Sequence, residues 1–322
     1  MWAKDINSST PLPMYYAEAE GKSDNDLRIA LKEAIKNHTD IGYKNLGIIM
    51  QWSDTEDANG IDIIDIYTTC TFTTSGPIKW ASSGNVGDGL NREHTVPQSW
   101  FDKQAPMVSD AFHIYPTDCK ANNHRSSYLY GECANGTSLS TKKCAETGKL
   151  GTSDWDEYYG TVYEVADEYK GDIARSYFYM ATRYAGQCED WIGGAFGSDN
   201  NGLDDYTAQL MLKWHRQDPV SEKELIRNEV IFGNPIYNKC DKKQANRNPF
   251  IDYPELVEYI WGDKKDIPVV ILELDSPYAN EGKTEGMEIV GTSPAAKKWL
   301  KDGQLFIIVG EQMYNLQGKR VK

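Results

Sequence analysis

The chain has 322 residues, 40% of them hydrophobic and 25% charged, which is typical of a globular protein and excludes a disordered one. Its formal net charge of −14 excludes a protein that binds nucleic acid along a broad basic face, but not an enzyme that meets phosphate through a few local cations. No apolar run approaches the roughly 18 residues of a membrane span, so we expect no membrane span.

The first part of the chain predicts an arm, a helix and a strand. Residues 1–22 are polar and contain prolines, so we expect an extended arm. Ser23 followed by Asp26 resembles a capping box, and the apolar residues after it recur at helical spacing. The β-branched run Ile61–Tyr67 predicts a strand, and the Gly- and Ser-rich residues 74–90 predict a loop.

The next segment carries most of the chemistry. It reads Asn-Arg-Glu-His-Thr-Val-Pro-Gln-Ser-Trp from position 91 to position 100. A second strand is expected at Ala111–Tyr115, ended by Pro116, and Thr117 is placed to cap a helix. On that helix Asn122 and Arg125 are three residues apart and share one face. The local prediction is strand, loop, strand and helix.

The rest of the chain predicts helices and then a different kind of segment. Three helices are expected, one from Asp172 to Tyr184, one at Tyr206–Arg216, and one at Ser221–Phe232 with a capping box. A last helix opens at Pro254. We therefore predict an α+β, mainly helical domain over residues 1–262. Residues 263–322 should form a linker and a small β-rich C-terminal tail, with strands at Leu305–Val309 and Gln312–Val321.

The residues themselves suggest metal-assisted hydrolysis. Glu93 and Asn122 offer the oxygen ligands that Mg²⁺ prefers, and a histidine such as His94 can accept a proton near neutral pH. Arg125, one turn beyond Asn122, could hold a phosphate oxygen. Neighbouring residues of a regular strand point to opposite faces, so Glu93 and His94 can serve one site only if the chain twists or leaves the strand between them. We expect such a break, helped by Pro97.

Several separated motifs, in the same order, resemble the endonuclease I family of His-Me finger (ββα-metal) nucleases. The motifs are Asn91-Arg92-Glu93-His94-x-x-Pro97-x-Ser99-Trp100, Asp110-x-Phe112-His113-x-Tyr115-Pro116-Thr117-Asp118, Asn122-Asn123-x-Arg125-Ser126 and Asn246-Arg247-Asn248-Pro249-Phe250. The resemblance covers most of residues 15–262. It implies a His-Me finger core in which His94 is the general base and Glu93 and Asn122 hold one Mg²⁺, for which Mn²⁺ or Ca²⁺ can substitute in binding. Products with 5′-phosphate and 3′-hydroxyl ends are implied as well.

Further polar residues are candidates for roles around this site. Arg92, His113 and Arg247 are candidate substrate-binding residues, with a structural role as the alternative for His113 and a lid-like structural role as the alternative for Arg247. The chain has six cysteines with no C-x2-C spacing, which gives a zinc site with His94 little support. Disulfides are preferred to free thiols, with no pairing assigned.

The expected function is a secreted, Mg²⁺-dependent, largely sequence-non-specific endonuclease that hydrolyses DNA and, as a further candidate substrate, RNA. Two rival hypotheses are a catalytically decayed secreted binding protein and a phosphodiesterase acting on a small substrate. No apolar segment of signal-peptide type follows Met1, so the chain is either cytoplasmic or a mature exported protein. The tail from Trp299 to Lys322 resembles C-terminal sorting tails, which favours a secreted, periplasmic or cell-surface location. We expect a monomer and infer no protein partner.

Overall fold

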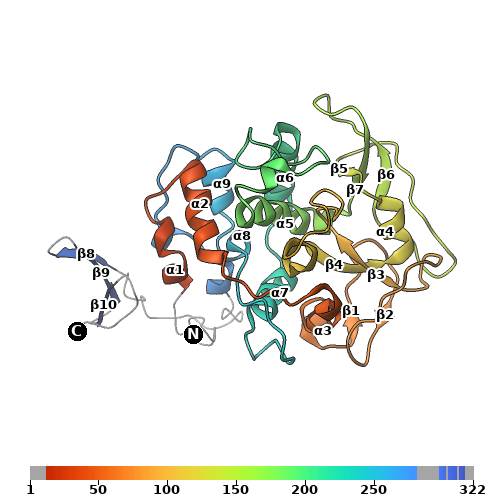
Figure 1. Cartoon of the computed structure of the whole chain (residues 1–322), viewed down its shortest axis with the longest axis horizontal. Helices are drawn as coiled ribbons and strands as arrows, with labels where there is room; N and C mark the ends of the chain where they lie inside the picture. The colour runs from red at the N-terminus through yellow and green to blue at the C-terminus, as the bar shows by residue number, and fades with distance from the viewer. Residues whose placement is uncertain (1–11, 281–296, 302–303, 310–311, 316–322) are drawn as a thin grey trace, which may run out of the picture.

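The computed structural model describes residues 12–280, 297–301, 304–309 and 312–315, and it has the α+β architecture predicted from the sequence (Figure 1). The helices are α1 Leu12–Tyr15, α2 Asp24–Ile35, α3 Leu46–Ser53, α4 Cys119–Arg125, α5 Lys170–Arg183, α6 Asp205–Gln217, α7 Glu222–Phe232, α8 Pro249–Asp252 and α9 Leu256–Ile260. The strands are β1 Asp62–Ile63, β2 Phe72–Thr73, β3 Leu90–His94, β4 Ile114–Asp118, β5 Leu129–Tyr130, β6 Lys149–Thr152, β7 Thr161–Glu164, β8 Lys297–Lys301, β9 Gln304–Val309 and β10 Gln312–Asn315.

The strands form small separate sheets. β1 pairs with β2 and β3 pairs with β4, both antiparallel. β7 lies between β5, which is parallel to it, and β6, which is antiparallel. In the C-terminal part β9 lies between β8 and β10. Two of these three strands fall where the sequence predicted strands, and the remainder of the predicted Gln312–Val321 strand lies outside the described residues.

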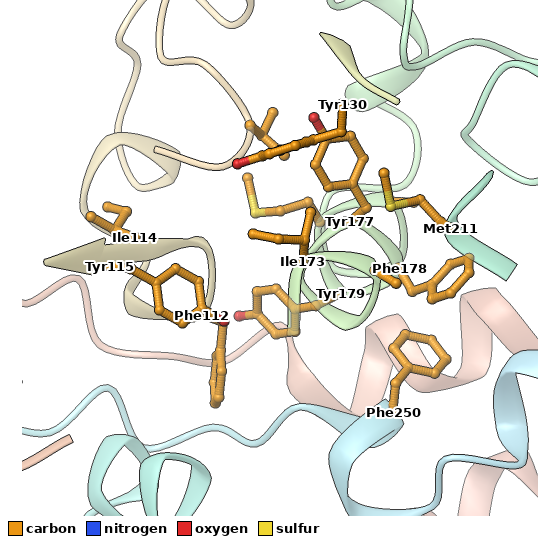
Figure 2. Close-up of a cluster of buried hydrophobic side chains, with 14 of the residues drawn as sticks. Phe112, Ile114, Tyr115, Tyr130, Ile173, Tyr177, Phe178, Tyr179, Met211 and Phe250 are labelled. Atoms are coloured by element: carbon orange, nitrogen blue, oxygen red, sulfur yellow. The ribbon is translucent and has the colours of Figure 1, made fainter. Parts of the chain in front are cut away.

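Helix α5 is the centre of the hydrophobic core. Every residue from Lys170 to Thr182 is buried, which is the property of a helix that packs on all sides. Figure 2 shows the side chains of α5 between those of the β4 region and those of α6 and α8. Its labelled residues are Phe112, Ile114, Tyr115, Tyr130, Ile173, Tyr177, Phe178, Tyr179, Met211 and Phe250. Burying one such large apolar side chain stabilises the fold by about 1.5–3 kcal/mol.

The helix starts confirm some of the predicted caps and correct others. The capping box of α7 is present, with Ser221 and Glu224 each bonded to the backbone of the other. Ser23 is the N-cap residue of α2, as predicted, but its side chain makes no capping hydrogen bond, so the capping box predicted with Asp26 is wrong. α4 is capped by Asp118 and not by Thr117, because Asp118 Oδ1 accepts hydrogen bonds from the N–H groups of Lys120 and Ala121.

Asp65 explains two departures from prediction. The strand predicted at Ile61–Tyr67 is confined to Asp62–Ile63. After it, the Asp65 carboxylate accepts hydrogen bonds from the Tyr67 N–H and the Thr68 hydroxyl, a local turn that replaces strand pairing. The same carboxylate accepts from the Thr117 hydroxyl, which is why Thr117 does not cap α4.

Pro116 lies inside β4 instead of ending it. The N–H of Thr95 donates to the His113 carbonyl, and that of Cys119 donates to the Gly89 carbonyl. Hydrogen-bonded pairs alternate along an antiparallel ladder, so the pair Arg92–Pro116 is a non-hydrogen-bonded one. The missing proline N–H costs no ladder bond there, since that position faces away from β3.

Both ends of the domain differ from the prediction. Helix α1 and a 3-10 turn at Ala17–Ala19 occupy the second half of the predicted arm, while residues 1–11 lie outside the described residues. Beyond residue 262, Val269 and Ile271 are buried, and the Tyr278 hydroxyl accepts a hydrogen bond from Asn228. The packed domain therefore continues past the boundary marked from the sequence.

The cysteines form fewer disulfides than expected. Cys70 and Cys144 are bonded across a sequence separation of 74 residues. Cys119, Cys133, Cys188 and Cys240 are free thiols. The preference for disulfides is therefore correct for one pair and wrong for the other four cysteines. Within the described residues, no helix is long and apolar enough to span a membrane.

Candidate active site

The candidate site is built on the β3–β4 ribbon and helix α4, the strand–strand–helix order predicted from the sequence. The three elements lie side by side at one end of the domain (Figure 1). Arg125 fastens the helix to the end of β3, since its Nη2 donates to the Thr95 carbonyl at 2.8 Å and its Nη1 lies 3.4 Å from the His94 carbonyl. The fold thereby holds α4 against the strand that carries Glu93 and His94.

Glu93 is buried with one carboxylate oxygen tied down and the other left over. Oε1 accepts from the hydroxyls of Tyr67, at 2.8 Å, and Tyr130, at 3.3 Å, and lies 3.4 Å from Nη1 of Arg125. Oε2 accepts no hydrogen bond from the described residues, and they do not enclose it completely. Burial raises the pKa of the Glu93 carboxyl, while Arg125 and the two tyrosine hydroxyls oppose that rise. The carboxylate is thus oriented with one oxygen available to a cation.

Asn122 is oriented in a similar way. Its Nδ2 donates a hydrogen bond of 3.1 Å to the carbonyl of Arg92 on β3. This bond assigns the amide nitrogen to the strand and leaves the carbonyl oxygen Oδ1 free of partners among the described residues. Glu93 and Asn122 therefore each present an unbonded oxygen, the donor type that a hard divalent cation requires.

His94 is held in a defined protonation state. Its Nε2 lies 3.2 Å from the Val108 carbonyl, and because a carbonyl only accepts, Nε2 carries the proton and Nδ1 carries the lone pair. The ring stacks on Tyr43, with centroids 5.8 Å apart, and meets the edge of His113 at 5.5 Å. Burial lowers the pKa of His94 to about 3, with His113 adding to the effect and the Val108 carbonyl opposing it. The imidazole is thus neutral at neutral pH.

The expected break between Glu93 and His94 is not present. β3 runs through both residues, which pair with Tyr115 and Ile114 of β4. Their side chains meet different neighbours, Tyr67 and Tyr130 for Glu93 and Tyr43 for His94, as opposite faces of a strand require.

The outer edge of β3 at Arg92 lies next to both His94 and Asn122. Among the residues that the structure describes, this sheet has two strands, and the Arg92 carbonyl points away from β4 because Arg92 is at a non-hydrogen-bonded position. That carbonyl accepts the bond from Asn122 and also favours the protonated form of His94. The edge at Arg92 therefore adjoins both His94 and Asn122, and Glu93 follows directly in the chain. Asn122 and His94 thus share the Arg92 carbonyl, whereas Glu93 contacts Tyr67, Tyr130 and Arg125.

Arg125, Arg247 and His113, which the sequence offered for phosphate or substrate contacts, are buried and bonded to other parts of the protein. Arg125 and Arg247 are each only 1% exposed. The guanidinium of Arg125 is engaged with Glu93 and backbone carbonyls, and that of Arg247 with Glu229 and Asp252. His113 is fully buried, with Nε2 2.8 Å from the Met107 carbonyl. These placements do not support the phosphate contact suggested for Arg125, nor the substrate contact suggested for Arg247, and they agree with the structural alternative for His113.

Arg92 lies differently, half-buried between two aromatic rings. Its guanidinium carbon is 4.2 Å from the ring centroid of Tyr43 and 4.4 Å from that of Trp80. Burial lowers the pKa of Arg92, and the Tyr43 hydroxyl opposes that change. This is the predicted substrate-binding arginine that remains accessible.

Reasoning from the sequence missed the residues that hold the site in shape. Tyr67, Tyr130 and Tyr43 reach Glu93 and His94 from segments 26, 37 and about 50 positions away in the chain. No local pattern marks them, since a chain with 20 tyrosines offers many candidates. The one usable signal is their type, because a buried tyrosine needs a partner for its hydroxyl.

Comparison with known proteins identifies the family of the chain. The profile of the endonuclease I family matches residues 23–255. An extracellular ribonuclease of Bacillus amyloliquefaciens is 34% identical over 267 residues, which cover 80% of this chain and 81% of that protein. One from Bacillus subtilis (strain 168) is 33% identical, covering 77% and 78%. Endonuclease-1 of Buchnera aphidicola subsp. Baizongia pistaciae (strain Bp) is 25% identical over 44% of this chain and 51% of its own length. The chain belongs to the endonuclease I family.

Proposed function

We propose that the protein is a secreted, Mg²⁺-dependent endonuclease that hydrolyses phosphodiester bonds of DNA and RNA with little sequence preference, through a His-Me finger formed by β3, β4 and α4. The observation that carries the proposal is the contact of His94 Nε2 with the Val108 carbonyl, which assigns the proton to Nε2 and the lone pair to Nδ1, beside the Arg92 edge. Family membership supports hydrolytic nuclease chemistry.

Glu93 and Asn122 would hold the cation. Both side chains are oriented by hydrogen bonds to one end, and both leave an oxygen unbonded, which fits an ion that takes one or two protein ligands and keeps several waters. Mn²⁺ or Ca²⁺ can bind the same oxygens. When bound, such a cation neutralises charge on the phosphate and on the leaving oxygen. The buried partners of Glu93 keep its carboxylate from rotating away when no cation is present.

His94 would act as the general base. Its neutral ring accepts a proton from the attacking water at Nδ1, and the resulting positive charge is stabilised by the Val108 carbonyl at Nε2. Tyr43 and His113 keep the ring in one orientation. Attack by water opposite the 3′ oxygen leaves 5′-phosphate and 3′-hydroxyl ends.

The names of the relatives bear on substrate and location. Two relatives with about a third of their residues identical are named extracellular ribonucleases, and a more distant one is named Endonuclease-1. These names support RNA as a substrate beside DNA, and action outside the cell. The acidic chain, with its net charge of −14, implies weak non-specific binding that salt weakens further.

Nicking of supercoiled plasmid and cleavage of a structureless RNA, each with Mg²⁺ and with EDTA, test the proposal. Wild-type protein should cleave both only with Mg²⁺, and His94→Ala should lose at least a hundredfold in rate, the usual contribution of a general base. A chromogenic small phosphodiester, assayed in parallel, should be a poor substrate. Cleavage in EDTA, or equal cleavage by His94→Ala, would overturn the proposal.

A further inference from the structure

Four planar groups form one continuous stack on the His94 face of β3. The indole of Trp80 lies against the Arg92 guanidinium, that guanidinium lies against Tyr43, and Tyr43 stacks on His94 with planes inclined by 21°. Trp80, Tyr43 and Arg92 are all partly exposed. The stack thus runs from the proposed base to the surface, and it places a cation on that path.

Arg92 lacks the partner that buried arginines of this protein have. Arg125, Arg175 and Arg227 are each paired with a carboxylate, those of Glu93, Glu224 and Asp54. Arg92 takes part in no ion pair with the described residues, and its enclosed Nε has no hydrogen-bond partner there. Its polar neighbour is the hydroxyl of Tyr43. In a chain with 48 acidic and 34 basic residues, an unpaired, partly buried cation points to an anionic ligand.

The guanidinium carbon of Arg92 lies 4.2 Å from the ring centroid of Tyr43 and 4.4 Å from that of Trp80, and these contacts do not use its N–H groups. A guanidinium held against two rings loses freedom of motion, and its N–H groups lie in the guanidinium plane. This arrangement suits two parallel hydrogen bonds to a phosphate and costs little side-chain entropy on binding. A lysine could supply the charge but not the planar fork.

The position of Arg92 in the strand defines which phosphate it can reach. Arg92 and His94 are two residues apart on β3 and share one face, roughly 6.6 Å apart along the strand. If a polynucleotide attacked beside His94 follows the direction of β3, the neighbouring phosphate of the same strand lies within reach of Arg92. A small phosphodiester has no such second phosphate.

We propose that Tyr43, Arg92 and Trp80 form a subsite for the phosphate next to the scissile one, so that the enzyme prefers polynucleotides to small phosphodiesters. This inference rests on the proposed function, because it takes His94 as the point of attack. Arg92 therefore replaces Arg125 as the arginine that meets the substrate backbone.

Arg92→Gln and Arg92→Lys test the subsite, with Lys44→Gln as the matched control. Glutamine keeps a planar polar group against the rings and removes the charge, while Lys44 is an exposed cation next to Tyr43 in the chain. Thermal melting of each variant shows that it is folded. The measurements are kcat and KM on an oligonucleotide, the salt dependence of kcat/KM, and the Kd of a fluorescein-labelled oligonucleotide in EDTA, where no cleavage occurs.

For Arg92→Gln we expect KM and Kd to rise about tenfold, as for a lost charge-assisted hydrogen bond, with kcat changed less than threefold. The slope of log kcat/KM against log salt should fall by about 0.7–0.9, the change for one phosphate contact. Arg92→Lys should keep the slope and recover part of KM, and Lys44→Gln should match the wild type. Wild-type KM, Kd and slope in a folded Arg92→Gln would overturn the inference while leaving an active, His94-dependent enzyme. Inactive wild type would instead overturn the proposed function.

Discussion

The hydroxyl of Tyr67 donates a hydrogen bond of 2.8 Å to Oε1 of Glu93, and the two residues are 26 positions apart in the chain. The Tyr130 hydroxyl lies 3.3 Å from the same oxygen and 2.5 Å from the Tyr67 hydroxyl, to which it can donate its one proton. One carboxylate oxygen is therefore held by hydrogen bonds, while the other accepts none from the part of the chain that the structure describes. This division orients the carboxylate before any cation arrives, which lowers the cost of binding one.

Tyr67→Phe should weaken cation binding more than it slows the reaction. The change removes one hydrogen bond to the Glu93 carboxylate, so the carboxyl is harder to ionise and freer to turn. We expect the Mg²⁺ concentration for half-maximal activity to rise about three- to tenfold, with kcat at saturating Mg²⁺ changed less than threefold. Tyr159→Phe is the control, since Tyr159 is 94% exposed. An unchanged Mg²⁺ requirement would contradict a positioning role for Tyr67.

Arg125→Met should mainly lower the stability of the fold. The change leaves the buried Glu93 carboxylate without its cation and the carbonyls of His94 and Thr95 without a donor. Breaking a buried pair from one side costs about 3–5 kcal/mol. Urea unfolding of wild type and variant measures this loss. A fully stable variant with a raised KM would instead identify Arg125 as a substrate-binding residue.

Acidification should reduce activity through Glu93 and not through His94. The pKa of Glu93 is raised, so its carboxylate becomes protonated, and loses the cation, as pH falls through that raised value. His94, with a pKa of about 3, gains its proton only at much lower pH. The acid limb of kcat/KM should therefore move to lower pH when Mg²⁺ is increased, by up to about one unit per tenfold. An acid limb of kcat/KM that stays near pH 6.5 at every Mg²⁺ concentration would instead show that protonation of His94 causes the loss of activity.

The thiol content of the protein should be four and not six or none. Cys119, Cys133, Cys188 and Cys240 are free, and Cys70 is bonded to Cys144. Titration of thiols in denaturant without reductant counts them directly. Reduction should also lower stability by about 2–4 kcal/mol, since the bond closes a loop of 74 residues. Six titrated thiols would show that the disulfide does not form.

Local patterns predicted the elements of the site better than its contacts. The strand–strand–helix order, the capping box at Ser221 and the orientation of Asn122 and Arg125 on one helix face all follow from spacing and residue type. The sequence does not predict that Pro116 lies inside β4. Its effect depends on whether its nitrogen faces β3, and that depends on the register of the two strands. Register is a long-range property that no local window contains.

The roles of the arginines illustrate the same limit. Arg125 and Arg247 have the residue type of a phosphate ligand, but the fold pairs them with Glu93 and Asp252 in the interior. Arg92 looks no different in the sequence, and it is set apart by its contacts with Tyr43, 49 positions away, and with Trp80, 12 positions away across the loop before β3. A sequence shows which residues are charged, whereas the carboxylate that pairs with each arginine is known only from the tertiary structure.

Binding of Mn²⁺ to the apoprotein, measured by calorimetry, tests most directly whether Glu93 and Asn122 hold the cation independently of the base. Wild type and His94→Ala should each bind one ion with similar affinity. Asn122→Ala should bind at least tenfold more weakly, and Glu93→Gln, which keeps the shape of the side chain for Tyr67 and Tyr130, should lose measurable binding. Equal binding by Glu93→Gln and wild type, or loss of binding in His94→Ala alone, would contradict the assignment.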